Sequence, residues 1–424
     1  MAASKCGLVW VTRTIPEAQT STCSAAPAAL QAAWAAHRVP LMSALTARLG
    51  CLDRAEDALS EAALRAQRSW SAAIPANPAG WLYRVALNVA HDQYRREVRH
   101  ARAAPSLLSH QTNDQDDRLE VSPEARLALF CLCAAPSLSQ QQQIALMLFH
   151  LAGLDCRSIG RAFLVSEATI HQRLSRARAK LRQRDKDGRS AADVSTVRSA
   201  LAVIYWQGYR DAAGGPVADG LGRDALQLTA ALCDAGQDDA ESWALLALLN
   251  CLEARRRSRL SDEGCFVPFD RQEISRWSGG AMRDAAAAMQ TVTALGQSPQ
   301  PYAIRAQIEL TRMVARRDGR NCDQPLLDLH DCLADMNSAP FAGVERALVL
   351  ARLQGPSAGL TALNALESQA DLSDHAGWHL AKAELQSQAG NARKARAHMI
   401  SALNLIDGAA ERAFVEAALR ALPA

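Results

Sequence analysis

Apolar residues recur at helical spacing through most of the chain, a pattern that predicts amphipathic helices rather than strands. From residue 28 to 102 the pattern is divided by helix boundaries. A first segment ends at Gly50, a residue type that commonly stops a helix. A second starts at Asp53, with acidic residues in its first turn as the helix dipole prefers. A third follows Asn77 and Pro78, which suit the N-cap and the first helical position.

The rest of the chain divides at polar stretches. Residues 103–123, "AAPSLLSHQTNDQDDRLEVSP", cannot build a core and are predicted to be a linker. A second helical unit is predicted over 124–190, and an array of stacked helices over 191–424. Residues 1–27 are rich in Ala, Ser, Thr and Pro, and we expect them to be a disordered extension.

The end of the array shows how its helices are arranged. The stretch "WHLAKAELQSQAGNARKARAHMISALNLI" predicts two helices separated at Gly390. The small-large-small spacing of Ala395, Met399 and Ala402 is similar to the second helix of a tetratricopeptide repeat. One degenerate match supports stacked helix pairs more firmly than it supports that particular repeat. The predicted fold class is therefore all-α, ending in a stacked-helix (tetratricopeptide-like) array.

Composition agrees with a folded, helical chain and adds an asymmetry of charge. Of the 424 residues, 49% are hydrophobic, 21% are charged and 5% are aromatic, and alternating Val-, Ile- and Thr-rich runs are hard to find. The net charge of +3 divides into +8 for residues 1–189 and −5 for the remainder. This asymmetry, weak on its own, favours nucleic-acid binding by the front half of the chain.

The 11 cysteines are scattered without a CxxC pair, so neither a disulfide framework nor a metal site is predicted. Cys131 and Cys133, in "LALFCLCAAP", are predicted to be packed apolar residues. The chain shows neither a signal-peptide core nor a run long enough to span a bilayer. We therefore expect a soluble, cytoplasmic protein without a metal, a cofactor or a membrane partner.

One predicted helix concentrates positive charge: "SEATIHQRLSRARAKLRQR", from Ser166 to Arg184. Its apolar inner face consists of Ile170, Leu174, Ala177 and Leu181. Its opposite face carries Thr169, Arg173, Arg176 and Lys180, flanked by His171 and Gln172. One face of this helix can therefore pack while the other offers hydrogen-bond donors.

The residues before this helix give it a context. The stretch "DCRSIGRAFLVS" predicts a short helix and a tight turn that ends at the N-cap Ser166. A supporting helix starts at Ser139, with Gln142 three residues later in a capping-box pattern. Two short helices joined in this way form a helix-turn-helix, whose second helix enters a major groove. Charge alone would favour a solvated surface stripe on the basic helix. The preceding short helix, the turn and the N-cap instead favour a DNA-binding helix.

The predicted roles along this helix differ with position. Side chains near its start are the predicted base readers, namely Glu167, Thr169, Gln172 and Arg173. Basic side chains further along are predicted to hold phosphates, namely Arg176, Arg178 and Lys180. Ser166 and His171 complete the predicted DNA-binding set.

At this point the residues resemble a known family. "SIGRAFLVSEATIHQRLSRARAKLR" resembles region 4 of a bacterial extracytoplasmic-function (ECF) sigma factor of the sigma-70 family, which reads the −35 promoter element. "AEDALSEAALRAQRSW", followed by "NPAGWLYRVALNVAHDQYRRE", resembles region 2. "LAVIYWQGY" and "FDRQEISRW", followed by a helical array, are similar to the C-terminal domain of ECF factors with a tetratricopeptide-like extension. The order of the three blocks is more specific than any one block.

The resemblance implies a domain order and a set of partners. Region 2 would cover residues 28–102, region 4 residues 124–190, and a regulatory helical domain residues 191–424. The partners would be promoter DNA and core RNA polymerase, through its β′ coiled coil and β flap, and a protein or intramolecular partner for the array. "LALFCLCAAPSL" lacks the Cys-Cys-His-Pro sequence of that group, and "YWQGY" differs from its usual "FNEGY". No group-specific role is therefore carried over to those positions.

The resemblance also assigns roles within region 2. Glu56, Asp57 and Glu61 would lie on the helix that docks on the β′ coiled coil, where an acidic face suits a basic partner. The periodicity alone would equally fit acids placed in a first helical turn by the dipole.

The next helix of region 2 would meet the −10 element. Its inward positions are Leu82, Val85 and Val89. Its other face carries Arg84, Asn88, Asp92, Arg95 and Arg96. Asn88 can hydrogen-bond a base edge, and the arginines can hold phosphates around a melting strand. Trp81 could stack on an unpaired base, although its spacing favours a place in the core.

Two other classes of function fit parts of the sequence. A free-standing helix-turn-helix regulator with a protein-interaction domain would have no need for paired region 2 and region 4 blocks. An enzyme is not predicted, because the chain shows no GxSxG, HExxH or phosphate loop and no catalytic residue. His375 and His379 lie four residues apart without an evident third metal ligand and are predicted to be surface histidines.

Two polar stretches of the array are not assigned a specific function from their sequence. "DRQEISRW", residues 270–277, fits a binding patch and a buried structural network equally well. "EARRRSRLSDEG", residues 253–264, is predicted to be a solvated loop.

Overall fold

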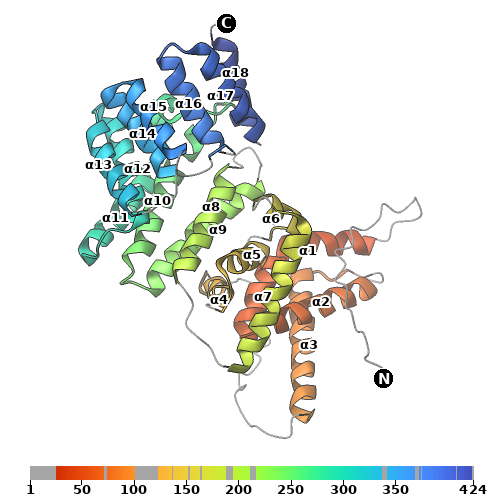
Figure 1. Cartoon of the computed structure of the whole chain (residues 1–424). Coiled ribbons are helices and arrows are strands. Elements are labelled where there is room, and N and C mark those ends of the chain that lie inside the picture. Colours follow the sequence, from red (N-terminus) through yellow and green to blue (C-terminus); the bar gives the residue numbers. More distant parts are fainter. Residues whose placement is uncertain are drawn as a thin grey trace, which may run out of the picture. The chain divides into compact units, whose positions relative to one another are not determined.

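The computed structural model describes residues 25–70, 74–100, 123–135, 137–150, 153–162, 165–187, 194–210, 216–336, 341–367, 372–373, 375–406 and 408–422. These residues form helices and connecting turns, with no β-strand among them beyond one isolated bridge between Leu260 and Phe266. The all-α prediction is confirmed. The described residues fall into two compact units that divide between Val121 and Ser122 (Figure 1). The predicted extension over 1–27 lies mostly outside the described residues, and so does the predicted linker.

The first unit is a three-helix arrangement. Its helices are α1 (Ala25–Leu49), α2 (Leu52–Ser69) and α3 (Pro78–His100), and each packs against the other two. α1 is followed by Gly50, whose φ of 66° is the left-handed conformation that favours glycine just past a helix end. The Gly80 amide donates to Oδ1 of Asn77 over 2.9 Å, so Asn77 caps α3 and Pro78 opens it, as predicted.

The second unit begins with four helices that correspond to the predicted helix-turn-helix and its support. They are α4 (Pro123–Cys133), α5 (Gln140–His150), α6 (Cys156–Ala162) and α7 (Glu167–Asp187). The predicted capping box precedes α5, because the Gln142 amide donates to Ser139 Oγ over 3.4 Å and the Ser139 amide donates to Gln142 Oε1 over 3.0 Å. Cys133 is fully buried, and burial raises the pKa of the half-buried Cys131 thiol, so both pack as apolar residues.

Two antiparallel helices, α8 (Val194–Arg210) and α9 (Pro216–Ala235), follow and lie side by side. α4 lies against α9, and α5 lies against α8. Arg126 of α4 donates both terminal nitrogens to the Asp224 carboxylate of α9, over 3.0 and 2.8 Å. The helix-turn-helix and the start of the array therefore belong to one packed body.

The remainder of the second unit consists of packed helix pairs. Its elements are α10 (Ala240–Ala254), η1 (Arg256–Ser258), η2 (Phe269–Arg271), η3 (Ile274–Arg276), α11 (Gly279–Leu295), α12 (Pro301–Asp318), α13 (Asp323–Asp335), α14 (Phe341–Gln354), α15 (Pro356–Glu367), α16 (Ala376–Gln388), α17 (Ala392–Leu405) and α18 (Ala409–Ala421). Successive pairs share apolar clusters, such as Val344 of α14, Leu363 of α15 and Trp378 of α16. The predicted helix pair at Gly390 is present as α16 and α17. The likeness to tetratricopeptide repeats stays a prediction.

Two local predictions for the array were wrong. Within 253–264, predicted to be a solvated loop, Arg259 and Ser258 are buried. His379 is buried rather than on the surface, with Nδ1 3.2 Å from His398 Nδ1 and Nε2 2.9 Å from the Ser373 carbonyl. In both cases the buried polar side chain has hydrogen-bond partners within the protein: the Tyr209 carbonyl of α8 for Arg259, Gln272 for Ser258, and the Ser373 carbonyl for His379. Within the described part of the chain, no helix combines the length and apolar character needed to cross a membrane.

Candidate nucleic-acid interface

The turn between α6 and α7 is fixed by close backbone packing. The Val165 amide donates to the Gly160 carbonyl over 2.9 Å. A Cβ added at Gly160 would lie 2.8 Å from the Val165 carbonyl oxygen, closer than non-bonded atoms approach. Ser166 then caps α7, because its Oγ accepts from the Thr169 amide over 3.2 Å. These contacts set the angle at which α7 leaves the turn.

The predicted inner face of α7 is confirmed. Its side chains pack inward together with Ile159 of α6, and all are buried: Ile170, Leu174, Ala177 and Leu181. α7 contacts both α5 and α6 through this face. The apolar stripe is what holds the basic helix on its support, so the orientation of the opposite face is set by packing.

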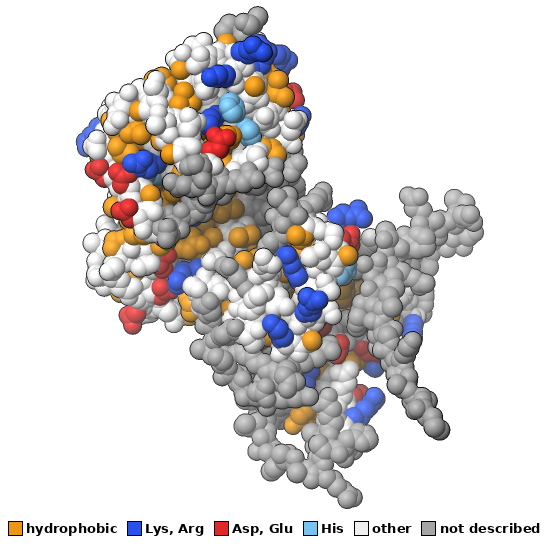
Figure 2. Space-filling view, viewed as in Figure 1, with side chains coloured by type: hydrophobic (Ala, Val, Ile, Leu, Met, Phe, Trp, Pro, Cys, Tyr) orange, Lys and Arg blue, Asp and Glu red, His pale blue; other side chains and the backbone are white. Residues whose placement is uncertain are grey.

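The opposite face of α7 is open to solvent. Gln172, Arg176 and Lys180 are exposed, and Ser166 and Glu167 are exposed at the helix start. Thr169, His171 and Arg173 are half-buried. Figure 2 shows Lys and Arg side chains gathered on the surface that α7 forms in Figure 1. This face therefore presents hydrogen-bonding and cationic groups along one helix.

Several predicted side chains on α7 also have partners within the protein. Glu167 pairs with Arg157 of α6 at 3.6 Å and lies 3.7 Å from His171. His171 Nδ1 is 3.8 Å from the Cys156 sulfur, so this ring lies at the contact between α6 and α7. The sequence analysis did not include Arg157 among the candidate DNA-binding residues, although this basic residue of "DCRSIG" is exposed beside the start of α7.

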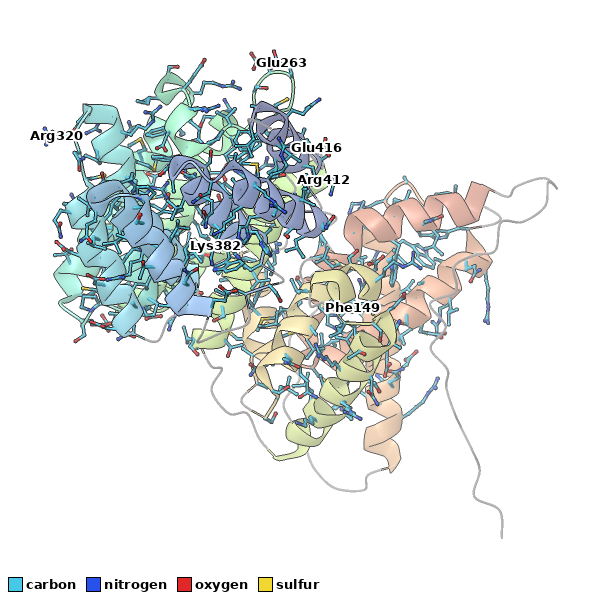
Figure 3. The ribbon with its side chains drawn as sticks, turned by 45° about the horizontal axis from the view of Figure 1, so that its top comes forward. Phe149, Glu263, Arg320, Lys382, Arg412 and Glu416 are labelled. Carbon is cyan, nitrogen blue, oxygen red and sulfur yellow. The ribbon has the colours of Figure 1, made fainter. Side chains whose placement is uncertain are left out.

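Two basic residues of α7 reach α5. The guanidinium of Arg178 lies 5.4 Å from the ring centroid of Phe149, which Figure 3 labels on α5. Lys180 Nζ donates to the Ser137 carbonyl over 3.3 Å and lies 3.5 Å from Gln142 Oε1. Arg178 thus contributes to the packing of α7 on α5, whereas Lys180 remains exposed.

α3 presents a second polar face in the first unit. Leu82 and Val89 are buried and Val85 is half-buried, as the periodicity predicts. The five side chains predicted for the other face are all exposed: Arg84, Asn88, Asp92, Arg95 and Arg96. α3 therefore carries a solvent-facing row that combines an amide, a carboxylate and guanidinium groups.

Trp81 lies at the junction of α2 and α3. Its ring packs edge-on against Trp70, with the centroids 5.6 Å apart, and Trp70 is buried. Trp81 itself is half-buried, so it packs on the buried Trp70 without being part of the core.

α2 carries the acidic residues that the family resemblance singles out. Asp57 is exposed, while Glu56 and Glu61 are half-buried. Glu61 accepts from Arg65 Nε over 3.0 Å on the helix surface. Next to them Leu64 is 51% exposed, so the face is acidic with an apolar element. The described residues hold no cluster of three or more His, Cys, Asp or Glu arranged to bind a metal.

Comparison with known families finds three matches in order along the chain. Residues 33–100 match sigma-70 region 2, residues 132–181 match sigma-70 region 4, and residues 193–293 match a family of unknown function, DUF6596. ECF RNA polymerase sigma factor SigE of Mycolicibacterium smegmatis is 29% identical over 129 residues, which are 30% of this chain and 50% of that protein. The chain is an ECF-like sigma factor with an extra C-terminal domain.

The predicted family of this ECF-like sigma factor is thereby confirmed. An uncharacterized protein of Rhizobium meliloti (strain 1021) is 30% identical over 402 residues, covering 91% of this chain and 94% of that protein, so the similarity extends over both the sigma regions and the C-terminal domain. No solved structure matches the chain. Sigma regions 2 and 4 are domains that bind DNA and RNA polymerase, and they are not enzymes. With both regions present, this sigma factor acts in transcription initiation, and its partners are core RNA polymerase and promoter DNA.

Proposed function

We propose that this sigma factor binds core RNA polymerase through α2 and region 4 and selects promoters by reading the −10 element with α3 and the −35 element with α7. The observation that carries the proposal is the pair of solvent-facing polar helices, one in each sigma region. Each has a packed apolar face and an exposed face with donors suited to nucleic acid. The C-terminal domain would control or support this activity.

The −35 element would be read in the major groove, which admits an α-helix. Gln172 and Arg173 lie in the first two turns of α7, where side chains of a recognition helix reach base edges. Arg176 and Lys180 are exposed one and two turns later and would contact phosphates, together with the Ser166 hydroxyl. Arg178 would act on DNA binding through Phe149, by fixing α7 on α5.

The −10 element would be held by the exposed face of α3 while its strands separate. The Asn88 amide can pair with an adenine edge, and the Asp92 carboxylate can accept from a cytosine amino group. The arginines at 84, 95 and 96 would hold the phosphates of the unpaired strand. The Trp81 ring is engaged with Trp70, so base stacking is assigned no part in this proposal.

Polymerase docking would use the acidic face of α2. Asp57 and Glu61 provide negative charge for a basic coiled coil, and Leu64 adds apolar area that is open in the free protein. Region 4 would contact the β flap. Promoter melting would then be coupled to polymerase binding, because both faces belong to one chain.

The proposal is tested by run-off transcription on the promoters upstream of the protein's own gene and its genomic neighbours. Core polymerase is added or withheld, and wild type is compared with an Arg173→Ala/Arg176→Ala double variant. The matched control is Arg320→Ala, an exposed arginine of the array outside the sigma regions. We expect promoter-specific transcripts that need both proteins, that the control retains, and that the double variant loses.

A salt titration of promoter binding by the holoenzyme sharpens the test. Each phosphate contact removed should reduce the slope of log affinity against log salt by about 0.9. Arg176→Ala should therefore lower the slope by roughly that amount, and Arg320→Ala should leave it unchanged. DNA binding without polymerase association or transcripts would instead identify a free-standing helix-turn-helix regulator.

A further inference from the structure

The connection between α10 and α11 is unlike the other interhelical connections of the array. It comprises residues 255–278, whereas Gly355 alone joins α14 to α15 and residues 389–391 join α16 to α17. Long connections in compact domains usually have a function of their own. We call residues 255–278 the strap. Its own regular structure is limited to η1, η2, η3 and one isolated bridge.

The near end of the strap is anchored on the C-terminal end of α8. Arg256 Nη1 donates to the Gly208 carbonyl over 3.3 Å, and Arg259 Nη1 donates to the Tyr209 carbonyl. The Arg259 guanidinium also lies 4.0 Å from the centroid of the Tyr209 ring. Carbonyls in the last turn of a helix have no partner within the helix, and cations there are favoured by the helix dipole. The strap therefore caps α8.

The middle of the strap is held by α12. Phe269 lies under two guanidinium groups, 4.4 Å from that of Arg312 and 5.5 Å from that of Arg255. Arg255 pairs with Glu309 of α12 over 3.0 Å, and both side chains are only 13% exposed. Arg316 of α12 donates to the Gln272 carbonyl over 3.4 Å. These buried charges are paired, as burial requires.

The segment of the strap between its first turn and η2 reaches α18, the last described helix. Phe266 packs edge-on against Phe414, with the ring centroids 5.6 Å apart. Arg259 pairs with Glu411 at 3.5 Å. Figure 3 labels Glu263 in the strap, and Arg412 and Glu416 on α18. Arg259 thus touches α8 and α18 at the same time, through different atoms.

We propose that the strap couples α18 to α8, so that a change at α18 alters the stability of the end of α8 and, through it, region 4. α8 lies against α5, and α5 carries α7. The strap has little regular structure of its own, so each anchor depends on the others for its position. Loss of the α18 anchor should therefore release Arg259 and uncap α8, whereas a self-contained loop would confine the change to the strap and α18.

The test is hydrogen exchange of the full chain, followed in peptides covering 200–210 and 259–277. Phe414→Ala removes the aromatic anchor on α18. Glu411→Gln removes the charge that pairs with Arg259 while keeping the shape of the side chain. Glu416→Gln is the matched control, since Glu416 is exposed on the same helix and pairs only weakly, at 3.7 Å, with Arg412.

We expect Phe414→Ala to raise exchange at least about tenfold in both peptides, Glu411→Gln to raise both by a smaller factor, and the control to raise neither. If Phe414→Ala speeds exchange throughout the second unit, that variant has destabilised the whole unit, and the result for Glu411→Gln alone tests the coupling of α18 to α8. Faster exchange in 259–277 with no change in 200–210, or no change in either, would overturn the proposal. The measurement needs neither polymerase nor promoter, so its outcome is independent of the proposed function.

Discussion

The turn of the helix-turn-helix offers a sharp prediction at a single residue, Gly160→Ala. The Gly160 backbone is not among the described glycines with positive φ, so alanine can adopt its conformation and the penalty is steric. The new Cβ would lie 2.8 Å from the Val165 carbonyl oxygen, whereas ordinary contact lies at 3.4–4 Å. The Val165 carbonyl belongs to backbone, so the turn itself has to move.

The cost follows from these distances. Overpacking of a tight site costs about 1–3 kcal/mol, and opening the turn also weakens the 2.9 Å hydrogen bond from Val165 to Gly160, worth about 1 kcal/mol. Part of this cost is offset, because alanine is favoured over glycine in a helix by up to about 1 kcal/mol, and by less near the end of α6. We expect a net destabilisation of about 1–2 kcal/mol at the turn, which corresponds to roughly 5- to 30-fold more frequent opening.

Native-state hydrogen exchange of residues 156–170 in the full chain measures this opening directly. The matched control is Gly220→Ala in α9, where an added Cβ would have nothing within 4 Å. The control should leave exchange in 156–170 unchanged and should slow exchange in α9, since alanine favours the helix. Unchanged exchange in 156–170 of the Gly160→Ala protein would refute the claim that this close approach fixes α7.

Two further predictions concern the second unit. Arg126→Met and Asp224→Asn should each lower the thermal stability of the unit. A double-mutant cycle should give a coupling free energy of about 1 kcal/mol between the two residues, limited by the exposure of Asp224. A coupling near zero would contradict the bidentate pair. Burial, then the charges of Arg312 and Arg352, lower the pKa of His330 to about 4 from 6.5. Between these values the unfolded chain binds more protons than the folded protein, so stability falls by roughly 3 kcal/mol as the pH is lowered from 6.5 to about 4, and His330→Asn should remove that part of the pH dependence of stability in urea unfolding.

Where a structural feature depends on residues close together in sequence, the prediction held. The capping box at Ser139 and Gln142, the cap at Asn77 and the stop at Gly50 all formed as expected. The two faces of α7 follow from its periodicity, because a helix places residues three and four apart on one side. These features are decided within a few residues, so each of them can be recognised in the sequence.

The residues that reasoning from sequence misjudged are those with distant partners. Arg259 looked solvated in "EARRRSRLSDEG", and its partners Tyr209 and Glu411 lie far along the chain in either direction. For Arg178 the predicted phosphate contact stays a prediction, but its contact with the Phe149 ring of α5 was not foreseen. No local pattern distinguishes an arginine that faces water from one that faces an aromatic ring supplied by another helix.

For this protein the sequence by itself determined the helical character of the chain, several helix ends in the sigma regions, the packed and open faces of α3 and α7, and the order of the sigma regions that identifies the family. Helical periodicity and capping are short-range, and a family pattern is carried by the residues themselves. Only the tertiary structure decided that region 4 and the C-terminal domain form one packed body, and that the strap joins α8, α12 and α18. Those contacts depend on where separate helices come together, which is a property of the packed core rather than of any one segment.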